Sequence, residues 1–415
     1  MAPNENLFET LRASEMNSAE LGEIVQSCLP GTRTRIGQQE VIFGLESDDT
    51  SYAVKFVFGE HGIVQIMPGP SLNAEQVVAI RGKVDRELRE PAPVWIGTAV
   101  LFSVCRVAGW FRHRDKLQIL PVPPDSPRAL GLGGEPFLVQ FPLRGSSEWA
   151  LNAMRREVEV QRAHLLLNAL LELGISRSRG VRHHWVLLPP ENTIAYCQEM
   201  YAFPPGLSAV PTSEGFSPDS FAPTDRLDPM TAIDPATYFT RRPAVNSLDR
   251  RLEIPSNLGA LLDRFYSSAN DDQERFLRAC FWFDHARTVS HDSSSAQFTA
   301  LMFAIESLMP NDGSRASCPT CKRSLGKGAR RRLREFLERY APAQPQLHKN
   351  RVELYYQLRC QLAHGGYLTL SDRGSIGFHG LLPKYPDELD VTTGAHQLVR
   401  IILINWLLAR GREAA

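Results

Sequence analysis

The 415-residue chain lacks the features of several large classes of protein. Its most apolar stretch, residues 401–409, contains Asn405 and is too short to span a bilayer. Residues 1–15 carry charges of both signs and no apolar core of a secretory signal. Seven cysteines, an odd number and mostly far apart, do not form the pattern of a disulfide framework. We therefore expect a reduced, cytoplasmic protein with no membrane partner.

The chain also has no excess of charge of either sign, because its 46 basic residues balance its 46 acidic residues. Any affinity for a nucleic acid must then come from a local basic patch. Residues 1–188 contain no P-loop, no dinucleotide-binding glycine pattern and no nucleophile elbow. Their sequence does not indicate what this part of the chain binds.

Two changes of pattern divide the chain into three parts. Residues 1–188 alternate β-branched and aromatic runs with Gly, Pro and Asp, which predicts a mixed α/β domain that senses a trigger or selects a target. Residues 189–255 hold eleven of the 29 prolines, a density that opposes regular helix and sheet. Because aromatic residues are frequent there, we interpret this part as an irregular strap or linker. In the first part, strands are expected at 41–45, 52–58, 64–66, 93–107, 117–122, 137–141 and 185–188, and helices at 73–89 and 148–173.

Residues 256–415 have a helical pattern, so the whole chain is predicted to be α+β, with an all-α bundle after the mixed domain. The clearest helix is expected at 293–309, where an apolar stripe ends at Pro310. The last helix is apolar nearly all round between Ile401 and Leu408, which is typical of the centre of a bundle or of a subunit interface. The helices of this part are expected at 257–266, 271–286, 293–309, 328–340, 351–364 and 394–410.

The segment YYQLRCQLAHGG, residues 355–366, contains the candidate catalytic residues Arg359 and His364. On an ideal helix, positions five apart are separated by about 140°, so this pair would not share a face. The glycines that follow suit the left-handed position just beyond a helix, so His364 is expected in the last turn. From there its ring can turn into a cleft that the long Arg359 side chain also reaches.

These two residue types suit RNA cleavage that needs no metal ion or other cofactor. An imidazole can accept the proton of a 2′-hydroxyl or protonate the 5′-oxygen that leaves. A guanidinium can bind the phosphate with two hydrogen bonds and stabilise the added negative charge. The products would carry a 2′,3′-cyclic phosphate. The alternative is a chance spacing in which His364 only neutralises the C-terminal dipole of its helix.

The wider context of this pair resembles a known family. The segments LYYQLRCQLAHGG and FTALMFAIESLMP, a CPTC pair and a basic helix are similar to the Apea-like branch of the HEPN superfamily, over about residues 257–410. The resemblance implies a helical bundle and a composite ribonuclease site across a homodimer or a higher homo-oligomer. In that superfamily the site is an Arg-x4–6-His motif, which matches Arg359 and His364. Members with a similar architecture act in antiviral defence, cutting cellular RNA such as tRNA so that infection aborts.

Two further residues bear on the implied activity. Glu306, in the AIESL stretch, is expected to orient Arg359 or His364 by a charge-assisted hydrogen bond, or to be an exposed or interhelical carboxylate. Cys360 follows the arginine, where catalytic members often have Asn, Asp or His and Apea-like sequences commonly have a small residue. Cys360 favours a second hypothesis, a non-catalytic HEPN module that dimerises, binds a nucleotide or partners another protein.

Residues 315–339 form a basic stretch, with nine Lys and Arg residues against two Glu residues. Such a stretch is either a solvated helix face or a surface that binds RNA phosphates. Its position close to the candidate catalytic motif favours contact with RNA. The predicted RNA-binding residues, which share one helical face, are Lys327, Arg330, Arg331 and Arg334.

Cys318 and Cys321 have the spacing of half a tetrahedral zinc site. A second such pair is missing from the sequence nearby, so a structural zinc would need other ligands or a second subunit. The alternatives are a reduced surface loop and a redox-sensitive sensor.

Overall fold

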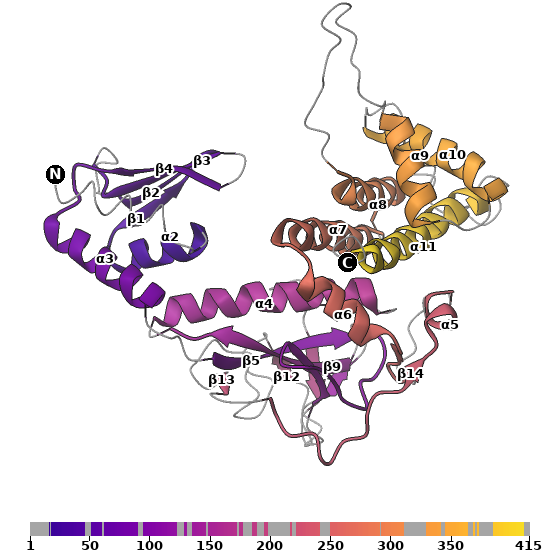
Figure 1. Ribbon diagram of the computed structural model, residues 1–415, viewed down its shortest axis with the longest axis horizontal. Helices are drawn as coiled ribbons and strands as arrows, with labels where there is room; N and C mark the ends of the chain where they lie inside the picture. Colours follow the sequence, from indigo (N-terminus) through magenta and orange to yellow (C-terminus); the bar gives the residue numbers. More distant parts are fainter. Residues whose placement is uncertain are drawn as a thin grey trace, which may run out of the picture. The chain divides into compact units, whose positions relative to one another are not determined.

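The computed structural model has an α+β fold (Figure 1). Its described residues form two compact units, which comprise residues 1–98, 141–159 and 205–222 in the first and residues 99–140, 160–204 and 223–415 in the second. Neither unit is continuous along the chain. The structure describes residues 16, 18–45, 51–59, 62–89, 94–122, 128–130, 135–146, 148–171, 174–176, 185–188, 195–197, 216–217, 221–240, 250–290, 292–310, 329–341, 345–363, 368–369, 372 and 385–410.

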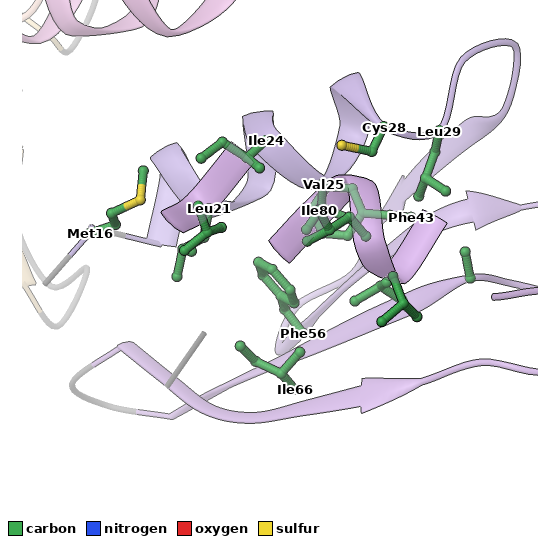
Figure 2. Close-up of a cluster of buried hydrophobic side chains, with 14 of the residues drawn as sticks. Met16, Leu21, Ile24, Val25, Cys28, Leu29, Phe43, Phe56, Ile66 and Ile80 are labelled. Atoms are coloured by element: carbon green, nitrogen blue, oxygen red, sulfur yellow. The ribbon is translucent and has the colours of Figure 1, made fainter. Parts of the chain in front are cut away.

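Residues 18–89 of the first unit contain an antiparallel sheet of strand order β1-β2-β3-β4 and two helices. Apolar side chains from helix and sheet form one core, in which Ile24, Phe56 and Ile80 are completely buried (Figure 2). The helix predicted at 73–89 is confirmed as α3, and Asn73 and Gln76 form reciprocal hydrogen bonds at its start. The elements are α2 (Ser18–Ser27), β1 (Arg33–Ile36), β2 (Glu40–Leu45), β3 (Val54–Gly59), β4 (Gly62–Pro68) and α3 (Ala74–Arg89).

The second sheet has the strand order β10-β5-β9-β7-β6, and β13 also pairs with β5. Five further short strands form a three-stranded sheet of order β12-β11-β8 and the pair β14-β15. The strands are β5 (Val94–Ser103), β6 (Phe111–His113), β7 (Leu117–Pro121), β8 (Arg128–Leu130), β9 (Glu135–Arg144), β10 (Ile175–Ser176), β11 (Trp185–Leu188), β12 (Ala195–Cys197), β13 (Phe216–Ser217), β14 (Ala232–Ile233) and β15 (Ile254–Pro255). Helix α4 (Trp149–Leu170) follows β9 in the chain.

The part predicted as a strap, residues 189–255, has only short elements where the structure describes it. They are β12, β13, β14, β15 and the six-residue helix α5 (Pro235–Thr240). Tyr238 of α5 is buried, and its ring lies 5.5 Å from the guanidinium carbon of Arg400. The aromatic residues of this part therefore anchor α5, although its prolines keep the elements short.

Six helices are described after residue 255, as the sequence predicted. Three are longer than expected: α7 ends three residues later, α10 begins six residues earlier and α11 begins nine residues earlier. Pro345 and Pro386 stand at or near the first turns of α10 and α11, where the N–H that proline lacks would have no helical partner. The helices are α6 (Leu258–Ser267), α7 (Asn270–Val289), α8 (Ser294–Leu308), α9 (Ala329–Tyr340), α10 (Pro345–Ala363) and α11 (Tyr385–Ala409).

Helix α8 is central to this bundle. It packs along α7 and also contacts α10 and α11. Its buried face includes Leu301 and Ile305, and the apolar end of α11 is buried as well, with Trp406 stacked on Phe276 of α7. The bundle thus buries the apolar faces of several helices around α8 and leaves the polar positions of α8 and α10 for a site.

Every helix in the described part of the chain falls short of the length and apolarity that a bilayer-spanning segment requires.

Candidate functional site

Helix α8 is held at its start and in its first half. At its start, the Ser293 hydroxyl accepts a hydrogen bond from the Ala296 N–H, as expected of an N-cap. Farther along, the Phe298 ring packs on the Tyr355 ring of α10, with 5.8 Å between centroids. This packing sets α10 beside α8, so that polar residues in the second half of each helix can meet.

Arg359 of α10 and Glu306 of α8 form a bidentate ion pair. The Arg359 Nε donates to Glu306 Oε1 at 2.8 Å, and Nη2 donates to Oε2 at 3.1 Å. The side chains are 30% and 38% exposed, so solvent and a ligand can reach both. The hydrogen bonds that Arg359 donates to Glu306 raise the pKa of the guanidinium further, so it stays charged. The structure therefore brings together two of the predicted site residues, 53 positions apart in the chain.

The geometry of this pair leaves part of the guanidinium usable. Glu306 binds the side of the group formed by Nε and Nη2. A guanidinium has five N–H donors, and those of Nη1 point away from a carboxylate held in this way. Arg359 can thus be oriented by Glu306 and still donate to a second anion such as a phosphate.

Cys360 and Tyr356 lie beside Arg359 on α10. Cys360 contributes to raising the pKa of both Tyr356 and Arg359. Burial, together with Cys360, raises the pKa of Tyr356 above its ordinary value, so its hydroxyl stays protonated at neutral pH. Tyr356 was not singled out in the sequence, although its i, i+4 spacing to Cys360 was a usable signal.

His364, the predicted partner of Arg359, lies outside the described residues. The described part of α10 ends at Ala363, the residue before His364 in the sequence. Its separation from Arg359 in space and its role stay predictions.

The predicted RNA-binding face is partly paired with acids. Arg330 forms an ion pair with Glu353 of α10, and Arg331 forms one with Glu335 at 2.9 Å. Arg334 is half-buried on the same helix, and Lys327 lies outside the described residues. The pairs reduce the positive potential of α9, while Arg330 places this helix next to α10, which carries Arg359.

No group of three or more His, Cys, Asp or Glu side chains that could hold a metal ion occurs among the described residues. Cys318 and Cys321 lie outside the described residues, and a structural zinc at this pair stays a prediction.

A carboxylate that the sequence analysis did not single out holds the start of α8. The Asp372 oxygens accept hydrogen bonds from the Ser293 hydroxyl at 2.7 Å and from the N–H groups of Ser294 and Ser295 at 3.0 and 2.8 Å. Burial alone would raise the pKa of Asp372, yet the hydrogen bonds from Ser295 and Ser293 lower it below its ordinary value. Asp372 therefore extends the N-cap of α8 from a segment that follows α10 in the chain.

Comparisons with protein-family models, with curated proteins and with solved structures found no match for this chain.

Proposed function

We propose that this protein is a metal-independent RNA endonuclease of the HEPN type, in which Arg359 and His364 are the catalytic residues. The observation that carries the proposal is the bidentate Glu306–Arg359 pair, which holds a charged guanidinium on α10 just before the position of His364. A lone surface arginine would lose side-chain entropy on binding a phosphate, whereas an oriented one loses less.

The reaction follows from the chemistry of these groups. A base, assigned to His364, takes the proton of a 2′-hydroxyl, and the 2′-oxygen attacks the adjacent phosphorus. The bond from phosphorus to the 5′-oxygen breaks, that oxygen receives a proton, and a 2′,3′-cyclic phosphate remains. Arg359 stabilises the extra negative charge on the phosphoryl oxygens through N–H groups that Glu306 does not use.

The partners of the proposed enzyme are RNA, such as tRNA, and a second copy of the chain, since the resemblance implies a composite site. Its biological role would be that of a cytoplasmic effector that aborts phage infection. The mixed α/β part would then sense the trigger or select the target.

The proposal is tested with purified wild-type protein, His364→Ala and Arg359→Ala on total tRNA in the presence of EDTA. We expect wild-type protein to leave 2′,3′-cyclic phosphate ends and either variant to lower the cleavage rate by at least about a hundredfold. Arg81→Ala is the matched control, because Arg81 also pairs with a carboxylate, Asp85 at 4.0 Å, but lies on α3 of the other unit. Equal cleavage by wild type and both variants would show that the site is wrongly assigned.

One observation favours a second candidate, the non-catalytic HEPN module. Glu306 occupies two donors of Arg359, so the arginine also serves as a link between α8 and α10. In this case, overexpression of the protein would be harmless to cells. Arg359→Ala would lower the stability of the fold and would not change the integrity of cellular RNA. Toxicity that disappears in Arg359→Ala and in His364→Ala would exclude this candidate.

A further inference from the structure

Four ring side chains form a cluster on α7 and α8, one helical turn from Glu306. Trp282 of α7 contacts Phe303 of α8 edge to face, with ring centroids 5.0 Å apart. Phe303 precedes Glu306 by three residues on α8, so the two lie on neighbouring positions of one helix face. We name this set, which consists of Phe281, Trp282, His285 and Phe303, the aromatic cluster.

The outer part of the aromatic cluster faces solvent. Phe281 is 42% exposed, and its ring is parallel to the ring of His285, at an interplanar angle of 1° and a centroid distance of 6.1 Å. His285 is exposed, while Trp282 is half-buried and contacts both of these rings edge to face. Phe303, also half-buried, contacts Trp282. Exposed Arg278 lies one turn before Trp282 on α7, so the surface combines flat rings with a cation.

The composition of this surface distinguishes between two kinds of occupant. A stable interface between subunits buries roughly 800 Å² per partner and has an apolar core. Among the described residues after 255, large exposed apolar side chains are limited to Phe281, Leu354 and Leu368. Within the aromatic cluster, Phe281 is the one large exposed apolar side chain, which is too little apolar surface for the core of an interface at this face. An exposed ring pair beside an arginine matches the size and chemistry of stacked bases.

We propose that the aromatic cluster is a stacking platform for unpaired bases of the RNA whose phosphate binds at Arg359. The proposal rests on the proposed endonuclease function and adds the form of its substrate, a single-stranded segment. Three residues, about 4.5 Å along the helix axis, separate Phe303 from Glu306 on α8, and Phe303 is linked through Trp282 to the exposed rings of Phe281 and His285. An unpaired base within a few nucleotides of the reacting phosphate would stack on these rings, and a base-paired duplex would not expose its faces to them.

The platform is tested by RNA binding, without any cleavage. Fluorescence anisotropy follows a labelled, single-stranded 2′-O-methyl RNA of mixed sequence, which lacks the attacking hydroxyl, with the full chain at one fixed salt concentration. We expect Phe281→Ala to weaken binding about tenfold, His285→Ala less, and Phe281→Tyr hardly at all, because tyrosine also stacks. Leu354→Ala is the control, since Leu354 is equally exposed and apolar but lies on α10, outside the cluster.

The outcomes separate this proposal from the one on which it rests. Suppose wild-type protein cuts RNA in a His364-dependent way, while Phe281→Ala binds the RNA as tightly as wild type. This result would overturn the platform and leave the endonuclease proposal in place. Phe281-dependent binding by a protein that cuts no RNA supports the platform and overturns the endonuclease. If Phe281→Ala dissociates into smaller species in sedimentation and keeps its RNA affinity, the surface is an interface between copies of the chain. This result would also overturn the platform.

Discussion

At the scale of single residues, Glu306 is the most informative side chain, because its two oxygens hold the Arg359 guanidinium in one orientation. Glu306→Gln keeps the shape and removes the charge. We expect the cleavage rate at saturating RNA to fall at least about tenfold with little change in KM, because a misoriented Arg359 costs most in the transition state.

The stability of the fold should change little in this variant. The pair is about one third exposed, and exposed ion pairs contribute at most about 1 kcal/mol to the free energy of unfolding. Glu335→Gln is the control, since it removes the acid of the exposed Arg331–Glu335 pair. Equal loss of activity in both variants would contradict a specific role of Glu306.

His396 of α11 sets a pH dependence of stability. Burial, with Arg400 and Arg287 adding to it, lowers its pKa to about 4, and its ring packs on Phe283 at 4.5 Å. The folded state therefore keeps His396 neutral, while the unfolded chain protonates it below about pH 6.5. Its contribution to stability is complete above about pH 6.5 and is lost as the pH falls toward 4.

Urea unfolding at pH 7.5 and at pH 5 measures this effect. We expect His396 to account for a loss of at most about 2 kcal/mol in the free energy of unfolding between these values. His396→Gln, which cannot be protonated, should show a smaller loss. A variant with the same pH dependence as wild type would rule out His396 as the titrating group.

At the scale of elements, α8 matters most, because it carries Glu306 and Phe303 and contacts α7, α10 and α11. Asp372 stabilises its first turn through three hydrogen bonds. We expect Asp372→Ala to lower the free energy of unfolding at neutral pH by about 1–2 kcal/mol, as loss of a cap does. Asp372→Asn, which keeps an acceptor oxygen, should lose less.

The same variants have a defined pH response. The pKa of Asp372 is lowered by folding, so its contribution is present above the ordinary value of 3.8 and is lost as the pH falls below it. The free energies of unfolding of wild type and Asp372→Ala, measured with a chemical denaturant, should therefore become equal as the pH falls into the acid range. A constant difference between these two free energies down to pH 3 would contradict a role of the Asp372 carboxylate in capping α8.

The elements differ in how well the sequence predicted them. Helix α8 lies within one residue of its predicted bounds, because an N-cap serine, an apolar stripe and a proline mark its start, face and end. Helix α2 was not predicted, although Leu21, Ile24 and Val25 have helical spacing. Its short length gave little periodicity to detect, and packing on the sheet core stabilises it.

At the scale of the whole molecule, Arg155 shows how distant segments are held together within the first compact unit. Its Nε donates to Glu20 of α2 at 2.6 Å and its Nη2 to Glu87 of α3 at 3.1 Å. All three side chains are largely buried, so removing the arginine would leave two buried carboxylates without their cation.

We expect Arg155→Leu to lower the free energy of unfolding of this unit by about 3 kcal/mol or more. Because the chain forms two compact units, calorimetry should show the change in one transition and leave the other in place. Arg86→Leu, an exposed residue of α3, is the control. If every calorimetric transition shifted to the same extent, the chain would unfold as one cooperative unit.

The sequence by itself determined the local features of this protein: the α+β class, the capped helix α3 and the bounds of α8. Each follows from hydrophobic period or from residues within one helical turn of each other. The tertiary structure decided that Glu306 meets Arg359, that Asp372 caps α8 and that Phe303 joins Trp282. These contacts join residues on separate elements, and only the packing of the elements brings such residues together.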